Sequence, residues 1–339
     1  MSDKLVSVEE IGRRARVGRA TAYRVLSNHP GISPEARRRV LSAIGELGYP
    51  RMRPKGRRRR GMLLWLPGIA RSIAGPVSWE VLDALEAALA ERGRAVRIVS
   101  CPLPASPEAL PLELLREDLE GILTIAFYSD AHLAALGRRW PVVSLMSSRQ
   151  ARGVLSIGPD YSGAARLAVE HLVARGHRRI ALVTGEIRER NFSRLFLDGY
   201  AGAMVRAGLG AEPGLVHSDP GNVGKGEVAI ADPPGQAAAR QLLARPDRPT
   251  AIIARHDSLT GIVKVISELK LGVPEDLSLV GCGGAGMPGQ FQPTLTAVCY
   301  SCAEMVALAL GLLGSVPPQG ARILVPTELR AGESVRAIG

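Results

Sequence analysis

The chain has 339 residues, 46% of them hydrophobic, which is enough for two or three domains with substantial cores. Its formal net charge of +11 is unevenly placed, because residues 1–60 carry 16 Lys/Arg and 5 Asp/Glu whereas the remainder carries 27 of each sign. Positive charge concentrated in this way predicts an acidic partner for the N-terminal segment, either nucleic acid or an anionic membrane. No apolar run reaches the roughly 18 residues that span a bilayer, and the N-terminus lacks a signal-peptide pattern. We therefore expect a cytoplasmic protein that is not inserted in a membrane.

The first 50 residues contain the signals of three short helices. Ser7 and Glu10 form a capping box that opens the first helix. The second helix is expected over about residues 19–27, with Ala20 and Val25 on its inner face and arginines on the other. Turn-rich letters, "NHPG", end it.

The third helix has the strongest boundary signals. Ser33 is expected to cap it, and Pro34 occupies the first helical position. Three short helices joined by a tight turn make a helix-turn-helix unit, whose second helix can enter the major groove of DNA. A basic three-helix bundle with a solvated charged face is the alternative interpretation of the same spacing.

A basic linker follows the predicted helices. It reads "PRMRPKGRRRRG" and holds seven basic residues between Arg51 and Arg60. Its prolines and glycines disfavour an ordinary helix. Charges of this density can contact phosphates or lie in a minor groove, with a steep dependence on salt.

From Gly61 onward, short apolar runs alternate with helical patterns, which is typical of parallel α/β units. The pattern runs through "GMLLWLP" to "PVVSLM", restarts at "VLSIG", and continues to "LSLVGC", so two doubly wound halves are predicted. Two later runs, "LTAVC" and "RILVPTEL", flank one more helix at about 301–314, and some of this material must cross back to the first half. The predicted domains are a helix-turn-helix domain at 1–50, a linker at 51–60 and a core at 61–339, with lobe 1 at about 61–157 and 294–320 and lobe 2 at about 158–293 and 321–339.

Long stretches of the sequence resemble one family. The segment "EEIGRRARVGRATAYRVLSNHPGISPEARRRVLSAIGELGY" is similar to the DNA-binding domain of lactose-repressor/galactose-repressor (LacI/GalR) regulators. The strings "DYSGAARLAVEHLVARGHRRIALVTG", "RPTAIIARHD", "GVPEDLSLVG" and "ILVPTELRAGESV" resemble its effector-binding core, which has the periplasmic-binding-protein fold. The resemblance implies a transcriptional regulator, in most cases a repressor, that binds a palindromic DNA operator as a homodimer and responds to a small-molecule effector. The chain carries no added leucine heptads, so we expect a dimer and not a tetramer.

The resemblance also assigns DNA-binding positions in the second helix: Arg19, Ala20, Thr21, Tyr23 and Arg24. Further DNA-binding candidates are Ser7 and, because of the charge density of the linker, its arginines: Arg53, Arg57, Arg58, Arg59 and Arg60. The sequence departs from the family in the turn, where Arg16-Val17-Gly18 replaces Gly-Val-Ser, and at Tyr23, where the family has serine. It also lacks the leucine with which the family's hinge helix wedges into the minor groove. We hypothesise that the arginine run replaces this wedge and reads groove potential.

The effector residues implied by the resemblance differ most. Polar anchors of the family fall on Met146, Phe196 and Gly283, and a further polar position is His256, followed by Asp257. The remaining candidates are Arg190, which matches an arginine of purine-binding relatives, Arg194, and the possible stacking residues Trp79 and Phe192. Burying an unpaired hydroxyl costs about 1–3 kcal/mol, so a typical sugar is disfavoured. Either the effector is less polar or aromatic, or the core has lost effector binding and serves only dimerisation.

Other function classes have less support. A solute-binding protein of this fold would need an export signal and no basic head. An enzyme is disfavoured because the chain lacks G-x-G-x-x-G after a strand, a P-loop, G-x-S-x-G and H-E-x-x-H. Cys299 and Cys302 form a single C-x-x-C without a second pair, so we expect reduced structural thiols, no metal site and no cofactor.

Overall fold

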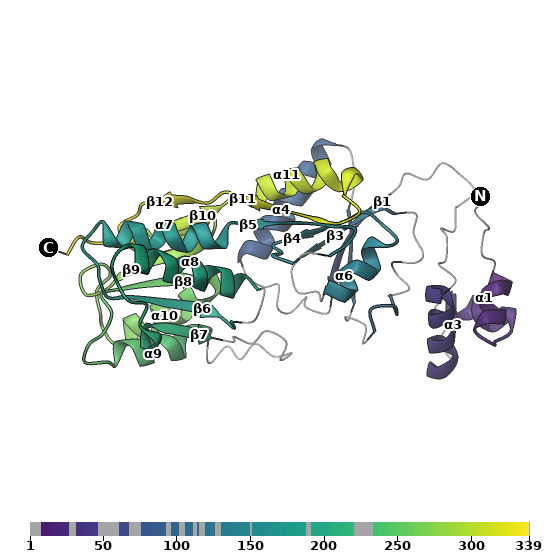
Figure 1. Ribbon diagram of the computed structural model, residues 1–339, viewed down its shortest axis with the longest axis horizontal. Coiled ribbons are helices and arrows are strands. Elements are labelled where there is room, and N and C mark those ends of the chain that lie inside the picture. The colour runs from purple at the N-terminus through teal and green to yellow at the C-terminus, as the bar shows by residue number, and fades with distance from the viewer. Residues whose placement is uncertain are drawn as a thin grey trace.

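The computed structural model describes an N-terminal three-helix unit and a two-lobed α/β core (Figure 1). The described residues are 8–26, 32–46, 61–67, 76–92, 96–101, 106–110, 114, 119–125, 130–149, 151–187, 191–219 and 233–338. Within these ranges, no helix is long and apolar enough to cross a membrane.

The α-helices are α1 (Val8–Arg14), α2 (Arg19–Leu26), α3 (Pro34–Glu46), α4 (Pro76–Glu91), α6 (Asp130–Gly137), α7 (Tyr161–Val173), α8 (Phe192–Arg206), α9 (Gln236–Leu243), α10 (His256–Glu268) and α11 (Cys302–Leu312). The strands are β1 (Gly61–Pro67), β2 (Val96–Cys101), β3 (Leu119–Ile125), β4 (Val142–Leu145), β5 (Val154–Pro159), β6 (Ile180–Gly185), β7 (Val216–Asp219), β8 (Ala251–Arg255), β9 (Ser278–Gly284), β10 (Thr296–Tyr300), β11 (Ala321–Val325) and β12 (Glu328–Arg330). Three short 3-10 turns complete the described elements: η1 (Pro213–Leu215), η2 (Pro288–Gln290) and η3 (Leu313–Ser315).

The N-terminal helices pack around a small apolar core of their own. The hydroxyl of Ser33 accepts a hydrogen bond from the backbone N–H of Ala36 at 3.2 Å, so the predicted cap of α3 is confirmed. The inner face of α2 was predicted wrongly in part: Ala20 is exposed, whereas Ala22 and Val25 are fully buried. The reason is helical spacing, since Ala22 and Val25 are three residues apart and share the face that contacts α1 and α3.

The first lobe is built on a parallel sheet with strand order β11-β5-β4-β3-β1-β2. Helices α4 and α11 pack on one face, where Leu85 and Met305 are buried. Helix α6, which the sequence analysis did not predict, covers the other face with Leu133 and Leu136. The sheet is therefore enclosed by helices on both sides, as its near-continuous apolar strands require.

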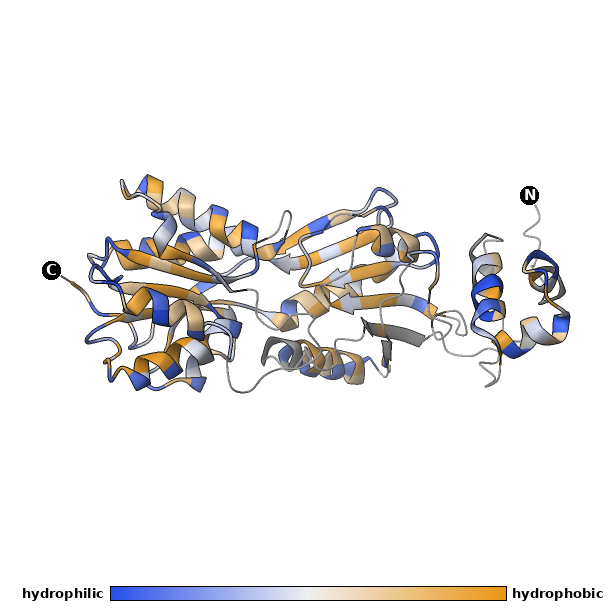
Figure 2. Ribbon diagram, turned by 90° about the horizontal axis from the view of Figure 1, so that it is seen from below, coloured by the Kyte–Doolittle hydropathy of each residue, from blue (hydrophilic) through white to orange (hydrophobic). Residues whose placement is uncertain are grey.

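The second lobe has the strand order β12-β10-β9-β8-β6-β7, with only β12 antiparallel to its neighbour. Helices α9 and α10 cover one face and α7 and α8 the other. A Cβ on Gly199 of α8 would lie 2.2 Å from the carbonyl oxygen of Ser162 in α7. Glycine is therefore needed for the two helices to approach this closely. Hydrophobic residues gather in the strands of both lobes (Figure 2).

The lobe limits drawn from the sequence place two strands wrongly. Strand β10 pairs with β9 in the second sheet, although 294–320 was predicted to belong to lobe 1. The single run "RILVPTEL" is two strands, β11 in the first sheet and β12 in the second. Pro326 lies between them and lacks a backbone N–H for either ladder, so the chain leaves one sheet and enters the other there. The chain thus crosses between the lobes after β5, after β10 and after β11.

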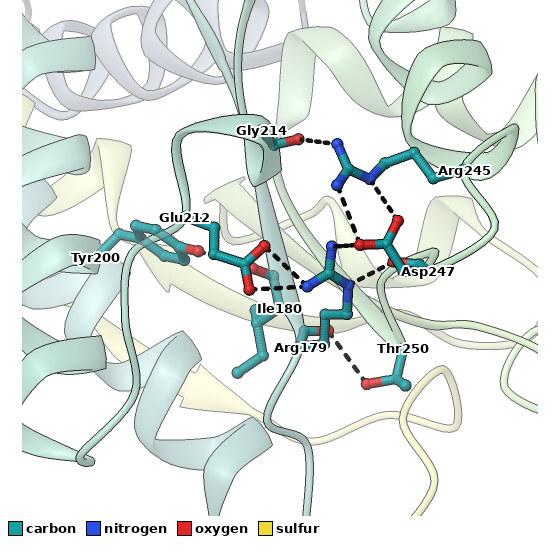
Figure 3. A network of polar contacts seen from close by, with 8 residues as sticks. All are labelled: Arg179, Ile180, Tyr200, Glu212, Gly214, Arg245, Asp247 and Thr250. Carbon is teal, nitrogen blue, oxygen red and sulfur yellow. Dashed lines mark hydrogen bonds and ion pairs between the residues drawn. The ribbon is translucent and has the colours of Figure 1, made fainter.

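An arginine network anchors the amino ends of the strands in the second lobe (Figure 3). Arg179, directly before β6, binds both carboxylate oxygens of Glu212 at 2.8 Å and Oδ2 of Asp247 at 2.6 Å. Arg245 binds the same Asp247 and also the carbonyl oxygen of Gly214. The hydrogen bond from Arg245 and the charge of Arg179 lower the pKa of Asp247. This network fixes the edge of the sheet opposite to the one where α8 and α10 begin.

A row of buried hydroxyls crosses the first sheet. Thr124, Ser144 and Ser156 are paired in register on neighbouring strands and are at most 1% exposed. Their hydroxyl oxygens have no hydrogen-bond partner in the described part of the chain. A buried hydroxyl without a partner is destabilising, so this row lowers the stability of the first lobe.

We expect Thr124→Val to stabilise the protein by about 1 kcal/mol, because valine has the same shape and no unpaired hydroxyl. Thr296→Val is the matched control: Thr296 is equally buried, but its hydroxyl accepts the backbone N–H of Gly332 at 3.0 Å. That variant should lose about 1–3 kcal/mol. Urea unfolding of both variants measures the two changes, and shifts of the same sign would contradict the assignment.

Candidate functional site

The outward face of α2 carries the residues that the sequence analysis assigned to DNA. Arg19, Ala20 and Arg24 are exposed and Thr21 is half-buried, while Ala22 on the opposite face is in the core. Only the backbone of residue 23 is described, so the role of the Tyr23 side chain stays a prediction. The exposed face is basic, and its first residue is also the first residue of the helix, the end that reads bases in a helix-turn-helix unit.

The turn before α2 has an unusual backbone. Arg16 has a φ of 53°, a left-handed conformation that costs a residue with a Cβ roughly 1–2 kcal/mol. Gly18, two residues later, has no positive φ, so the backbone there does not require the conformational freedom of glycine. The carbonyl of Ala15 accepts from Nε of Arg39 at 3.0 Å, and Arg39 also donates to the carbonyl of Arg16. The side chain of Arg39 in α3 thus holds the turn in place.

Several predicted residues lie outside the described ranges. They are Ser7, Arg53, Arg57, Arg58, Arg59, Arg60 and Arg190, and the side chain of Trp79 is not described either. Their assignments to DNA and effector stay predictions.

A second group of functional side chains gathers at the carboxyl edge of the second sheet. We call it the carboxyl-edge cluster, and it consists of Tyr161, Phe192, Ser193, Arg255, Asp257 and Tyr300. Tyr161 and Phe192 are the first residues of α7 and α8, Asp257 is the second residue of α10, and Arg255 and Tyr300 end β8 and β10. Crossings after β5 and β10 bring the two tyrosines together, with ring centroids 6.4 Å apart and edge to face.

Arg255 is at the centre of this cluster. Its side chain is only 10% exposed, and Nη2 binds Oδ2 of Asp257 at 2.7 Å. The guanidinium carbon lies 4.0 Å from the ring centroid of Phe192, a cation–π contact. Nη1 lies 3.5 Å from the hydroxyl of the fully buried Ser193.

The charges of the cluster are set by enclosure and by Arg255. Burial alone would raise the pKa of Asp257, but the charge of Arg255 and two backbone N–H groups lower it further, so the carboxylate is ionised. Burial lowers the pKa of His256 more than Asp257 raises it, so the imidazole is neutral at neutral pH. Asp257 keeps 40% of its side-chain surface exposed, so water can reach its carboxylate although protein atoms surround the rest of the residue.

A carboxylate of the first lobe reaches the second lobe. Glu80 of α4 accepts the backbone N–H of Gly286 at 3.3 Å, in the segment that follows β9. A Cβ on Gly284 would lie 2.1 Å from Oε2 of Glu80, so the glycine makes room for the carboxylate. Burial and a hydrogen bond to Glu80 raise the pKa of the Cys302 thiol to about 12. The glycine-rich stretch "GCGGAGMPGQ" therefore makes room for the carboxylate of Glu80 and donates a hydrogen bond to it.

The other predicted effector residues do not form one group: two are neighbours, and the rest lie in different surroundings. His256 and Gly283 are neighbours, because a Cβ on Gly283 would lie 2.9 Å from that of His256. Phe196 is fully buried with the apolar core between α7, α8 and the sheet, which excludes it from a solvent-accessible site. Arg194 is exposed and pairs with Asp198 one turn along α8 at 2.9 Å. Met146 follows β4, has a φ of 54° and packs on the core of the first lobe.

Arg255, Tyr161 and Tyr300 were missed by the sequence analysis. In "AIIARHD" only the family position His256 and the following Asp257 were predicted, although an arginine at the end of an otherwise apolar strand also indicates a site residue. The tyrosines come from segments 139 residues apart in the sequence, so nothing local could pair them.

Comparison with known proteins places both parts of the chain. Residues 7–51 match the bacterial regulatory proteins of the lacI family, and residues 169–335 match the periplasmic binding protein-like domain. An uncharacterized HTH-type transcriptional regulator in the aml 5' region of Streptomyces limosus is 31% identical over 316 residues, covering 90% of this chain and 86% of the relative. The chain belongs to the LacI family.

Solved LacI-family structures have the same fold. The complex of the transcriptional regulator CelR with cellobiose is 25% identical with a TM-score of 0.67, covering 97% of this chain and 99% of that one. The lac repressor dimer bound to operator and the anti-inducer ONPF is 21% identical with a TM-score of 0.64, covering 98% and 100%. The expected fold, a helix-turn-helix domain with a periplasmic-binding-protein-like core, is confirmed.

Relief of the left-handed turn should be measurable. Arg16→Gly is expected to stabilise the N-terminal domain by about 1 kcal/mol, because glycine adopts this backbone without a penalty. Arg14→Gly in the last turn of α1 is the control and should destabilise by about 1 kcal/mol through helix propensity. Hydrogen exchange of the α1 and α2 amides reports on this domain alone. Equal slowing or equal acceleration in both variants would show that the conformation of Arg16 is not strained.

The contact between the lobes predicts a non-additive pair of substitutions. Glu80→Ala removes the carboxylate and Gly284→Ala displaces it, so each should cost about 1–2 kcal/mol. The double variant should be no worse than either, leaving a coupling of at least about 0.5 kcal/mol. The control is Glu86→Ala, an exposed residue of the same helix, which should add independently to Gly284→Ala. Urea unfolding measures all five proteins, and additive effects of the Glu80 pair would refute the contact.

Proposed function

We propose that the protein is a transcriptional repressor that binds a palindromic DNA operator as a homodimer in the cytoplasm, with a small-molecule effector that changes operator affinity. The observation that carries this proposal is the exposed face of α2, where Arg19, Ala20 and Arg24 project from a unit whose apolar residues are otherwise packed. The match of residues 7–51 to the lacI family supports it, as does the charge excess of the first 60 residues.

A dimer is supported by the similarity to the lac repressor, which was solved as a dimer bound to operator. A two-fold dimer presents two copies of α2, so the operator should contain two inverted half-sites.

Effector action requires two arrangements of the lobes with different ligand affinities. The three crossings and the bond between Glu80 and Gly286 tie the lobes together. A ligand at the carboxyl-edge cluster would contact α7, α8, α10 and the end of β10 at once. It would thereby favour one arrangement, which the basic linker transmits to the helix-turn-helix domain.

Selection of bound DNA from a random pool, at two salt concentrations, tests the proposal. We expect inverted repeats with information at several bases. Arg24→Ala should lose about 1–3 kcal/mol at one base position and relax specificity there. Replacing Arg57–Arg60 by alanine should weaken all sequences alike and reduce the salt slope by up to about 4, according to how many of the four meet phosphates.

Arg166→Ala, on the exposed side of α7, is the control and should leave both specificity and slope unchanged. A featureless pool would refute sequence-specific repression and leave only a basic arm. An unchanged salt slope in the linker variant would refute the role of the arginine run.

A further inference from the structure

We propose that the carboxyl-edge cluster binds an organic carboxylate with an aromatic body. This inference rests on the proposed function in one respect, that the bound acid is the effector of the repressor. The chemistry of the site is argued from three features: an incompletely paired guanidinium, two unpaired phenols and a set of aromatic faces.

The guanidinium of Arg255 lacks acceptors. The residue is 9% exposed, and its one close partner is a single oxygen of Asp257. Its contact with Ser193 is at the limit of hydrogen bonding, and no further described residue accepts from the remaining N–H groups. A buried guanidinium normally has its donors satisfied, and a carboxylate does so with two parallel bonds. The remaining N–H groups can therefore bind an acceptor supplied from outside, such as water or the carboxylate of a ligand.

Two phenols next to Arg255 are also unpaired. Tyr300 is 5% exposed, yet its hydroxyl makes no hydrogen bond within the described residues, and the same holds for Tyr161. By contrast, the buried Tyr200 donates to the carbonyl of Ile180 at 2.7 Å. Burial raises the pKa of both Tyr161 and Tyr300, so both hydroxyls keep their protons and can donate.

The balance of donors and acceptors selects the charge of the ligand. Glu80 is bound to Gly286 and Cys302, and Asp257 is bound to Arg255 and to backbone N–H groups. Each carboxylate thus has protein partners, although Asp257 stays 40% exposed, whereas several donors of Arg255 and both phenols have none among the described residues. A carboxylate only accepts, so it fits this set, whereas sugar hydroxyls would also need acceptors.

The body of the ligand follows from the aromatic rings. Phe192 lies 5.7 Å from Tyr161, centroid to centroid, and Tyr161 lies 6.4 Å from Tyr300. Rings at these distances can hold another ring by offset or edge contacts. An aromatic acid would place its carboxylate at Arg255 and its ring against these side chains.

Binding to the full-length protein, without DNA, tests the inference by calorimetry and thermal shift. The probes are phenylacetate, its neutral isostere 2-phenylacetamide, the cation 2-phenylethylamine, and cellobiose. We expect saturable binding of phenylacetate, with the amide weaker by at least about tenfold because it forfeits a charged hydrogen bond. Arg255→Met should weaken the acid by about 10–100-fold and leave the amide unchanged. Tyr300→Phe should weaken the acid by about 3–10-fold, the loss of one neutral hydrogen bond.

The matched control is Arg194→Met, since this arginine is exposed on α8 and paired with Asp198. It should bind phenylacetate as the unchanged protein does. Should Arg255→Met not fold, Tyr300→Phe and the comparison of acid with amide carry the test.

The inference is overturned if the amide or amine binds as tightly as the acid, if cellobiose binds most tightly, or if Arg255→Met binds the acid normally. It is equally overturned if benzoate, phenylacetate and 3-phenylpropionate all fail to bind at millimolar concentration. Arg255 would then fill the site with its own side chain, and the core would bind no effector of this class. None of these outcomes affects selection of operator DNA, so failure of the ligand and failure of the repressor can be told apart.

Discussion

Three crossings of the chain between the two sheets are the constraint on which the core depends. Each crossing joins a strand of one lobe to an element of the other, so neither lobe can be formed from a continuous half of the sequence. The first crossing ends at Tyr161 and the second begins at Tyr300, which places these rings beside Arg255 at the carboxyl edge of the second sheet. The same connections that define the architecture therefore assemble the candidate effector site.

The sequence predicted most of the elements and the order in which they occur. Apolar runs bounded by glycine and proline indicated strands such as β6 and β9 to within two residues, because a buried parallel strand leaves a continuous hydrophobic signature. Helix α6 was not predicted, since its eight residues, "DAHLAALG", are apolar on most sides and have little helical periodicity. The division of 321–330 between two sheets could not be predicted, because strand pairing is a long-range property that only Pro326 hinted at.

The candidate sites differ in how far the sequence could go. The face of α2 was predictable, since one short helix presents all of its residues and their exposure follows from period and charge. The carboxyl-edge cluster was not, because four segments of the chain that lie far apart in the sequence supply it. Phe196 shows the converse error: the resemblance implied an effector-binding position, but the apolar side chain is fully buried in the core.

Gly283 and Gly284 carry no side chain at the end of β9, and Glu80 of the first lobe brings a carboxylate to this place. The consequence is physical. An aspartate within the lobe would keep its charge at the site in every arrangement of the lobes, whereas the charge of Glu80 is there only when the lobes are together. Moving the lobes apart would then break the hydrogen bond between Glu80 and Gly286 and carry the charge of Glu80 away from the glycine-rich segment that follows β9. The position of the Glu80 charge is thus coupled to the arrangement of the lobes, and a ligand that interacts differently with the two arrangements would shift both.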